Sequence, residues 1–271
     1  MAQENMMDDA IFDNLAPSQT VNTLEGTTHT LANEVPLAIT LNGVNHAVMM
    51  VSPYQLEAFI IGFLLTEGII RHHRDIHDLE FTRQQNAIIA SVTLANRCHQ
   101  PWQEQRRNLA GRTGCGLCGI ESLQAALPKL PPLSASPLPG TEALMGLRAQ
   151  LPDWQKLNRD CGALHAAFFA DEQGQIQHAS EDVGRHNALD KLLGWRHRQP
   201  NPPSGMILVT SRCSIELILK MVRTHNPTLL TLSAPTLLAV EQARHYRLNL
   251  IHLPYQQQPR VYAASECSHY A

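Results

Sequence analysis

Two cysteines, Cys115 and Cys118, stand at C-x-x-C spacing in the glycine-rich stretch Thr113-Gly114-Cys115-Gly116-Leu117-Cys118-Gly119. Such a pair can form half of a zinc site, a redox disulfide or a sulfur relay, or occur by accident. A four-cysteine zinc site needs a second C-x-x-C, which the sequence lacks, and no spacing supports a mixed site with a lone cysteine and a histidine. A thioredoxin-type pair follows a strand and opens a long helix, whereas this pair follows a basic, polar stretch. Zinc and redox exchange stay open but are not favoured.

The glycines around the pair indicate a mobile loop, because glycine permits many backbone conformations. A cysteine that collects sulfur from one protein and delivers it elsewhere must move between partners. Arg106, Arg107 and Arg112 precede the pair and would favour the thiolate. The spacing therefore favours sulfur transfer over two incidental thiols, although spacing alone does not choose between Cys115 and Cys118.

A second group of reactive side chains is the turn Glu181-Asp182-Val183-Gly184-Arg185-His186-Asn187, at the start of a predicted helix. Free N–H groups at the helix start, the Arg185 guanidinium and the space beside Gly184 suit an anion or a nucleotide. A capped, salt-bridged helix start explains the same residues equally well.

A third group, Thr210-Ser211-Arg212-Cys213-Ser214-Ile215-Glu216, is another strand-to-helix turn with hydroxyl groups and an arginine. Two such turns on adjacent units would face one cationic crevice suited to phosphates. We therefore expect Asp182, Gly184, Arg185, His186, Ser211 and Arg212 to bind a cofactor.

Composition indicates an ordinary soluble globular protein, with 44% hydrophobic and 17% charged residues in a chain of 271. The net charge of -3 predicts no bulk attraction to nucleic acid or to an anionic membrane. No apolar run is long enough to span a bilayer, and residues 1–14 lack the features of a signal peptide. We expect a cytoplasmic protein whose six cysteines are thiols rather than a disulfide scaffold.

The first half is expected to hold a disordered arm (residues 1–20) and a β-rich domain (21–130). Strands are predicted at 35–40 and 47–51 around the hairpin dipeptide Asn42-Gly43, and at 79–83 and 87–94. A helix should begin at Pro53, capped by Ser52, and end before Gly68. We expect a mobile loop over 97–119, a short helix over 120–127 and a proline-rich linker over 131–140.

The second half, 141–262 before a tail (263–271), alternates short apolar strands with helices. The predicted strands are 163–169, 175–179, 206–209, 229–232 and 248–253, and the predicted helices are 186–193, closed by Gly194, 214–223 and 237–247. This alternation predicts a layered sheet with mostly parallel crossovers, whose ligands bind at the carboxyl ends of the strands. The scattered histidines, His72 and His73 among them, show no metal-ligand spacing and are expected to be surface or satisfied core residues.

At these motifs the chain resembles the FdhD family, the formate dehydrogenase accessory sulfurtransferases. The residues that carry the resemblance extend over most of the sequence: Glu34-Val35-Pro36, Ser52-Pro53, Gly62-Phe63, Thr66-Glu67-Gly68-Ile69-Ile70, Thr113 to Gly119, His165-Ala166-Ala167, Glu181 to Lys191, Ser211-Arg212, Ser214, Glu216 and Lys220.

The resemblance implies an α/β (α+β) fold, with a three-layer α-β-α, cytidine-deaminase-like C-terminal domain on a mixed sheet and a smaller β-rich N-terminal domain. It also implies a homodimer that receives persulfide sulfur from a cysteine desulfurase. The sulfur would pass to the molybdenum cofactor, in its bis-guanine-dinucleotide form, before insertion into formate dehydrogenase, and GDP could mimic this cofactor. Cys115 matches the persulfide cysteine of the family, and Cys118 would assist or resolve.

Zinc deaminases carry H-x-E and P-C-x-x-C at two successive helix starts. The corresponding turns here, Gly184-Arg185-His186 and Thr210-Ser211-Arg212-Cys213, lack that ligand set, so the resemblance implies a pocket without zinc. Cys213 stands where the family commonly has a small apolar residue, and we expect it to serve packing.

The family also carries a cofactor-contacting Gly-Arg pair near the C-terminus. The corresponding stretch here, Leu253-Pro254-Tyr255-Gln256-Gln257-Gln258, has neither residue, and only Arg260 offers a substitute. The sequence thus predicts a sulfurtransferase acting on the molybdenum cofactor. The alternatives are a non-enzymatic cofactor-binding chaperone and a relative of the zinc deaminases.

Overall fold

The computed structural model describes residues 15–110 and 128–266. Cys115, Cys118, Arg112 and the helix predicted over 120–127 lie outside these ranges, as do the side chains of Arg106 and Arg107. Among the described residues, no helix combines the length and the apolar character needed to cross a membrane.

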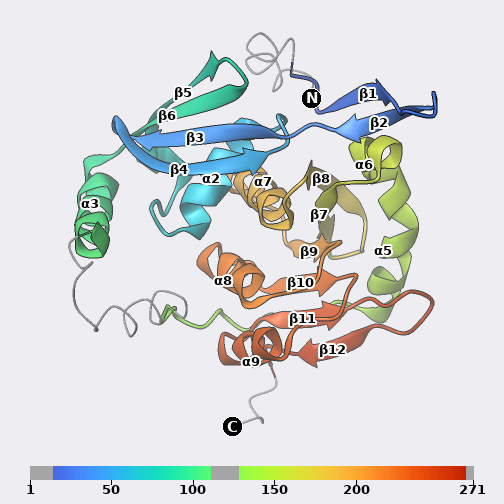
Figure 1. Ribbon diagram of the computed structural model, residues 1–271. Coiled ribbons are helices and arrows are strands. Elements are labelled where there is room, and N and C mark those ends of the chain that lie inside the picture. Colours follow the sequence, from blue (N-terminus) through green and yellow to red (C-terminus); the bar gives the residue numbers. More distant parts are fainter. Residues whose placement is uncertain (1–14, 111–127, 267–271) are drawn as a thin grey trace.

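The first half of the chain is built on a four-stranded sheet (Figure 1) with the order β4-β3-β6-β5. Its elements are β3 Val35–Leu41, β4 Val44–Val51, β5 Ile76–Gln84, β6 Ala87–Leu94, the helices α2 Leu56–Thr66 and α3 Asn96–Ala110, and the 3-10 turn η1 His73–Asp75. Both predicted hairpins are confirmed, and Asn42 and Gly43 adopt φ of 48° and 79° in the first turn. Alternate residues of β3 are buried, so one face of this sheet packs against α2 in a single core.

The start of α2 differs from the prediction. The residue before the helix is Gln55, with φ of 51° and no side-chain cap. Ser52 makes contacts in the second half of the chain instead: its N–H donates to Asp182 at 3.0 Å, and its hydroxyl accepts the Val183 N–H at 3.2 Å. Gly68 follows the helix end with φ of 73°, as predicted.

The mobile loop predicted over 97–119 is wrong for its first part, because α3 extends from Asn96 to Ala110. Cys98 and Trp102 are four residues apart, on one face of the helix, and both are buried in the core of the first half. The polar residues between them concealed this short apolar stripe.

The second half is built on a six-stranded mixed sheet with the order β12-β11-β10-β9-β7-β8. Its elements are β7 His165–Asp171, β8 Ile176–Asp182, β9 Gly205–Val209, β10 Thr228–Thr231, β11 Asn249–His252, β12 Arg260–Ala263, and the helices α5 Thr141–Trp154, α6 Lys156–Cys161, α7 Arg185–Arg198, α8 Ile215–Arg223 and α9 Leu237–His245. The parallel pairings of this sheet are β9 with β10 and β10 with β11, whereas β7 pairs antiparallel with β8 and with β9, and β12 pairs antiparallel with β11.

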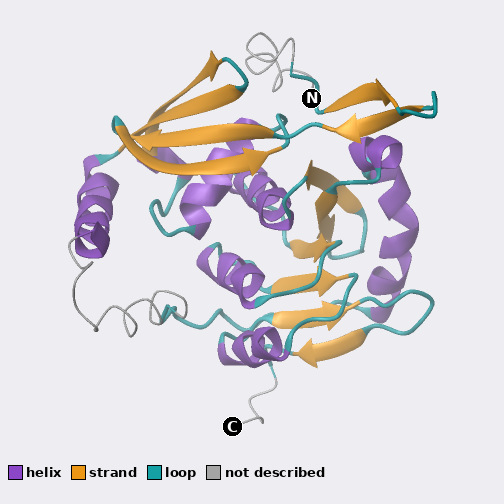
Figure 2. Cartoon of the chain, in the orientation of Figure 1, coloured by secondary structure: helices purple, strands orange, loops and turns teal. Residues whose placement is uncertain are grey.

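Helices cover both faces of this sheet (Figure 2). Apolar residues of α7, α8 and α9 pack on one face and those of α5 on the other, which gives the predicted three-layer α-β-α arrangement. The sequence analysis did not foresee α5 and α6, or the hairpin of β1 Ser18–Asn22 and β2 Thr28–Ala32, which lies beside α6. The predicted disordered arm is therefore wrong for Ser18 to Thr20.

The predicted linker, residues 131–140, has no regular secondary structure but is packed on the second half. Leu133 is buried and its N–H donates to the Tyr246 carbonyl at 2.9 Å. The Ser136 carbonyl accepts hydrogen bonds from the side chains of Asn249 and Ser265, so Ser265, in the predicted tail, is also tied to the sheet. The prolines restrict the backbone of this segment, and its polar groups form hydrogen bonds with the second half. It is therefore part of the folded second half rather than a flexible linker.

Helices α2 and α7 join the two halves, and glycines allow them to approach closely. A Cβ added to Gly62 would lie 1.8 Å from the Asp190 carbonyl oxygen, and one added to Gly194 would lie 1.9 Å from the Ala58 carbonyl oxygen. The sequence analysis predicted that Gly194 ends this helix. That prediction is wrong, because α7 continues to Arg198.

We expect Gly194→Ala to lower the free energy of unfolding by about 2–3 kcal/mol, because two rigid helix backbones must move apart. Urea unfolding of the purified chain measures this loss. Gly146→Ala is the matched control: Gly146 also lies within a helix, α5, but an added Cβ would meet nothing within 4 Å. The control should be neutral or stabilising by up to about 1 kcal/mol, and an equal loss in both variants would contradict the close approach.

Candidate functional site

The turns that the sequence analysis singled out lie at one edge of the six-stranded sheet. The strands β9, β10 and β11 are parallel, and β8 points the same way because β7 is antiparallel to both β8 and β9. The segments after these strands, 183–184, 210–214, 232–236 and 253–259, therefore share the carboxyl edge. This is the edge where open α/β sheets bind ligands.

Backbone hydrogen bonds fix these segments to one another. The Thr236 N–H donates to the Cys213 carbonyl at 3.0 Å, and the Leu253 N–H donates to the Thr231 carbonyl at 2.8 Å. The guanidinium of Arg148, from α5, donates to the carbonyl of Leu253 at 2.8 Å and to that of Leu232 at 3.4 Å. The edge is thus a rigid platform rather than a set of independent loops.

Asp182 lies at this edge but does not present its carboxylate to a ligand. Its side chain is fully buried and pairs with the ammonium of Lys191 at 2.6 Å, itself fully buried. The carboxylate also accepts the Gly184 N–H at 2.9 Å and the Asn187 side-chain N–H at 2.9 Å. Its oxygens are therefore occupied, and the expected contact between Asp182 and a cofactor is replaced by a structural role at the start of α7.

Gly184, Arg185 and His186 form the beginning of α7, where the first N–H groups have no partner within the helix. A Cβ on Gly184 would lie 2.7 Å from Asn187 Nδ2, so the glycine allows that side chain to fold back. Arg185 and His186 are partly exposed. Burial lowers the pKa of His186, and the charge of Arg185 lowers it further, so its imidazole is neutral at neutral pH.

The two predicted turns meet, as expected. His186 Nε2 lies 3.2 Å from a carboxylate oxygen of Glu216, in the first turn of α8, and the Ser214 hydroxyl donates to the same oxygen at 2.6 Å. These contacts bring the starts of α7 and α8 together. The hydrogen bond from Ser214 is the main cause that lowers the pKa of Glu216, so the crevice carries one negative charge among its cations.

Ser211 and Arg212 occupy the turn after β9 in different ways. Ser211 is buried, and its hydroxyl donates to the Arg212 carbonyl at 3.1 Å. The Arg212 side chain is exposed. Ser211 therefore shapes the turn, whereas Arg212 is available to an anionic ligand.

The stretch from Leu253 to Gln258 follows β11 at the same edge. Leu253 belongs to the core and Pro254 is partly buried, so neither offers a polar side chain. Tyr255 is 71% exposed and lies 5.6 Å from the Arg148 guanidinium. Gln256 and Gln258 are exposed, and Gln257 accepts a hydrogen bond from Arg260, the one substitute expected for the missing arginine. The segment therefore lies at the edge where a cofactor is expected. Besides Arg260, a second guanidinium, that of Arg148, lies beside it, and the sequence analysis did not predict this.

Other residues of the family resemblance lie in a buried polar cluster between the halves. The ammonium of Lys220 donates to both carboxylate oxygens of Asp190 at 2.8 Å and to the Thr66 hydroxyl at 2.9 Å. Asp190 and Thr66 are each 1% exposed. These motif residues hold α2, α7 and α8 together, which their spacing in the sequence could not reveal.

Two of the three cysteines that the structure describes, Cys98 and Cys213, are poor candidates for sulfur chemistry. Cys98, Cys161 and Cys213 are free thiols. Burial raises the pKa of Cys213 to about 12 and also raises that of Cys98, where the nearby Asp75 carboxylate acts in the same direction. Thiols with raised pKa values are weak nucleophiles. Cys213 lies in the core, in agreement with its predicted packing role.

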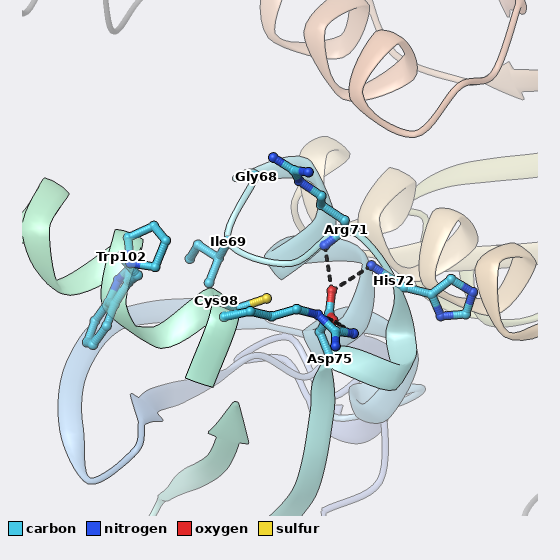
Figure 3. A pocket seen from close by; sticks show the side chains of 9 residues that line it. Gly68, Ile69, Arg71, His72, Asp75, Cys98 and Trp102 are labelled. Carbon is cyan, nitrogen blue, oxygen red and sulfur yellow. Dashed lines mark hydrogen bonds and ion pairs between the residues drawn. The ribbon is translucent and has the colours of Figure 1, made fainter. Parts of the chain in front are cut away.

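A cavity of about 390 Å³ lies beside α3 (Figure 3). Its lining residues are Gly68, Ile69, Arg71, His72, Asp75, Arg97, Cys98, Pro101 and Trp102. The Asp75 carboxylate accepts the backbone N–H groups of Arg71 and His72, each at 2.9 Å, and pairs with Arg97. The residues that line this cavity lie before the C-x-x-C segment in the sequence. The family motif Thr66 to Ile70 overlaps the lining at Gly68 and Ile69, but the sequence analysis did not predict a cavity there.

The metal ligands of a zinc deaminase are not brought together at the carboxyl edge. Across residues 15–110 and 128–266, groups of three or more metal-ligating side chains occur only at His72, His73 and His197, away from both turns. Cys213 is completely buried and His186 contacts Glu216 instead. The described part of the edge therefore offers cations and helix N-termini, which suit phosphates.

Comparison with known proteins identifies relatives of this chain. The model of the FdhD/NarQ family matches residues 32–268. The sulfur carrier protein FdhD of Bordetella petrii is 42% identical over 238 residues, which cover 87% of this chain and 85% of the relative. The protein of the same name from Chromobacterium violaceum is 43% identical over 223 residues, covering 79% and 81%.

A solved structure, of a candidate formate dehydrogenase accessory protein from Desulfotalea psychrophila, has the same fold. It aligns with a TM-score of 0.65 at 24% identity and covers 92% of this chain and 96% of its own. With a family model that spans most of the sequence and relatives above 40% identity, this chain belongs to the FdhD/NarQ family.

Proposed function

We propose that this chain is a sulfurtransferase that carries persulfide sulfur from a cysteine desulfurase to the molybdenum cofactor. The cofactor, in its bis-guanine-dinucleotide form, would receive the sulfur before its insertion into formate dehydrogenase. The relatives named sulfur carrier protein support the carrier role. The family resemblance supports the cofactor, the partner enzymes, a homodimer and a cytoplasmic location.

The observation that carries this proposal is the meeting of two helix starts at the carboxyl edge, where His186 and Glu216 join α7 to α8 at 3.2 Å. The positive ends of both helices point to this edge, and Arg185 and Arg212 stand at its partly exposed and exposed positions. A guanine dinucleotide carries phosphates that need such donors. The edge is therefore a suitable place to hold the sulfur acceptor.

The carrier step begins at Cys115. Its thiolate attacks the outer sulfur of the desulfurase persulfide, a new S–S bond forms, and the desulfurase cysteine leaves as a thiolate. Cys115 then carries the outer sulfur as its own persulfide. The acceptor then attacks that outer sulfur with an electron pair of its own, so the bond between acceptor and sulfur forms, the S–S bond breaks and Cys115 leaves as a thiolate. Cys98 and Cys213 cannot replace it, because their raised pKa values keep them protonated.

The test is the intact mass of the full chain after incubation with a cysteine desulfurase and cysteine. We expect one added sulfur atom, removable by a reductant, and peptide mapping should place it on Cys115. A chaperone that only binds the cofactor would gain no mass, and this outcome would refute sulfur carriage while leaving nucleotide binding possible.

The nucleotide part of the proposal makes a separate prediction. We expect Arg212→Gln to weaken GDP binding about tenfold, because one charge-assisted hydrogen bond to phosphate is lost. Isothermal titration calorimetry measures the affinity. Arg83→Gln is the control, since Arg83 is an exposed arginine of β5, in the four-stranded sheet of the first half. Equal affinities of the two variants would show that the nucleotide does not bind at this edge.

A further inference from the structure

Three histidines from distant parts of the sequence form a cluster between the two halves of the chain. His72 and His73 lie at the start of η1, and His197 lies near the end of α7. One ring nitrogen from each lies within 4.8 Å of the others. The ring centroids are 4.4 Å apart for His72 and His73, and 5.1 Å apart for His72 and His197. The prediction of a surface or satisfied core residue holds for His72, which is exposed, but not for His73 and His197, which each have a buried ring nitrogen without a hydrogen-bond partner.

Two of the imidazoles have unused buried nitrogen atoms. His73 Nδ1 and His197 Nε2 are inaccessible to solvent and have no hydrogen-bond partner. Buried polar atoms are almost always paired, so an unpaired one calls for an explanation. A metal ion would supply the missing partner to both nitrogen lone pairs.

The charged groups near the cluster act in opposite directions. The neighbouring cations are Arg74, Arg196 and Arg198. They oppose a metal ion, although Glu57 pairs with Arg198 at 3.0 Å and offsets its charge.

We propose that His72, His73 and His197 bind one divalent transition-metal ion of the zinc class. Three imidazoles are a known ligand set for zinc, which prefers nitrogen donors at about 2.0–2.1 Å. Tetrahedral coordination at that distance sets the nitrogen atoms about 3.3 Å apart. The three side chains reach this spacing by small rotations, since they already lie within 4.8 Å.

His72 is the exposed member of the site, and its ring points away from Cys98 and Trp102 (Figure 3). Its Nδ1 accepts the Arg74 N–H at 3.2 Å. If His72 binds the metal through Nε2, its remaining proton must sit on Nδ1. Nδ1 can then no longer accept the Arg74 N–H, so this hydrogen bond is lost. His72 is therefore the weakest of the three ligands, and a fourth position remains for water.

Metal binding at this site would tie η1, which follows α2, to the end of α7. An ion that binds only the folded chain raises the melting temperature. The site is independent of sulfur transfer, because none of its ligands belongs to the carboxyl edge or to the C-x-x-C segment. One zinc per chain would therefore not by itself indicate a deaminase relative.

The experiment is a titration of the chelator-treated full chain with Co²⁺ and with Zn²⁺. It uses a Cys115→Ala/Cys118→Ala background, since paired thiols also bind these ions. We expect one equivalent bound, visible absorption of nitrogen-coordinated Co²⁺ and a higher melting temperature. His73→Gln and His197→Gln should each weaken binding at least tenfold, and His72→Gln should have a smaller effect.

The matched control is His77→Gln, which removes an exposed histidine close to η1 that is not part of the cluster. It should bind metal as the parent chain does. The proposal is overturned if the parent chain binds no metal, or if His73→Gln and His197→Gln bind as tightly as His77→Gln. Should His197→Gln fail to fold, His73→Gln decides, because melting without metal reports its folding separately.

Discussion

Cys115→Ala is expected to abolish sulfur transfer, with no sulfur adduct after desulfurase loading and no sulfur delivered to the cofactor. The reason is that the outer sulfur needs a nucleophilic thiolate, and burial raises the pKa values of Cys98 and Cys213. Intact mass measures the loading. A desulfurase reaction containing radioactive cysteine measures the delivery.

Cys118→Ala is the matched control, because it removes a thiol from the same C-x-x-C pair. It should still acquire sulfur at Cys115, although resolution of the persulfide is expected to slow. Both variants should bind GDP as the unmodified chain does, since the nucleotide is expected at the carboxyl edge. Full transfer by Cys115→Ala would refute the assignment of the carrier cysteine.

Lys220→Met should lower the free energy of unfolding by about 3–5 kcal/mol, because it breaks a buried ion pair and leaves one charge behind. The substitution removes an ammonium that donates to both oxygens of Asp190 and to Thr66. Asp190 is 1% exposed, so its carboxylate would remain buried without a counter-charge. Urea unfolding at neutral pH measures the loss.

The pH dependence of this variant provides a second measurement. Burial raises the pKa of Asp190, and Lys220 opposes that rise. Without Lys220 the folded-state pKa rises further above its unfolded value, so the folded chain holds a proton that the unfolded chain has released. The deficit should therefore be largest at neutral pH, shrink as the pH falls through the folded-state pKa, and be smallest near the unfolded value of about 4.

Arg198→Met serves as the control for a broken ion pair. Arg198 and Glu57 lie 3.0 Å apart, but their side chains are 38% and 44% exposed. Water solvates the remaining charge, so the loss should stay below about 1 kcal/mol. If Lys220→Met were no less stable than Arg198→Met, the buried cluster would not hold the two halves together.

Much of the fold could be predicted because its signals are local. Alternating apolar residues around Asn42-Gly43 predicted the hairpin of β3 and β4, and short apolar runs predicted β9, β10 and β11 within one residue or two. One segment was missed because its buried apolar side chains are few, namely Cys98 and Trp102 on α3. A stripe of two residues among polar neighbours is too weak a period to recognise.

The sequence by itself determined which residues are available for chemistry: the C-x-x-C pair, and the arginines in two turns that follow strands. It could do so because residue type and spacing set nucleophilicity and charge. Only the tertiary structure decided how those residues are used. Asp182 and Lys191 neutralise each other inside the core, whereas Arg212 stays exposed at the edge. His197 lies beside His72 and His73 because α7 packs against α2, and η1 is the next element after α2 in the chain. Burial and pairing depend on contacts between segments far apart in the chain, and no local pattern encodes them.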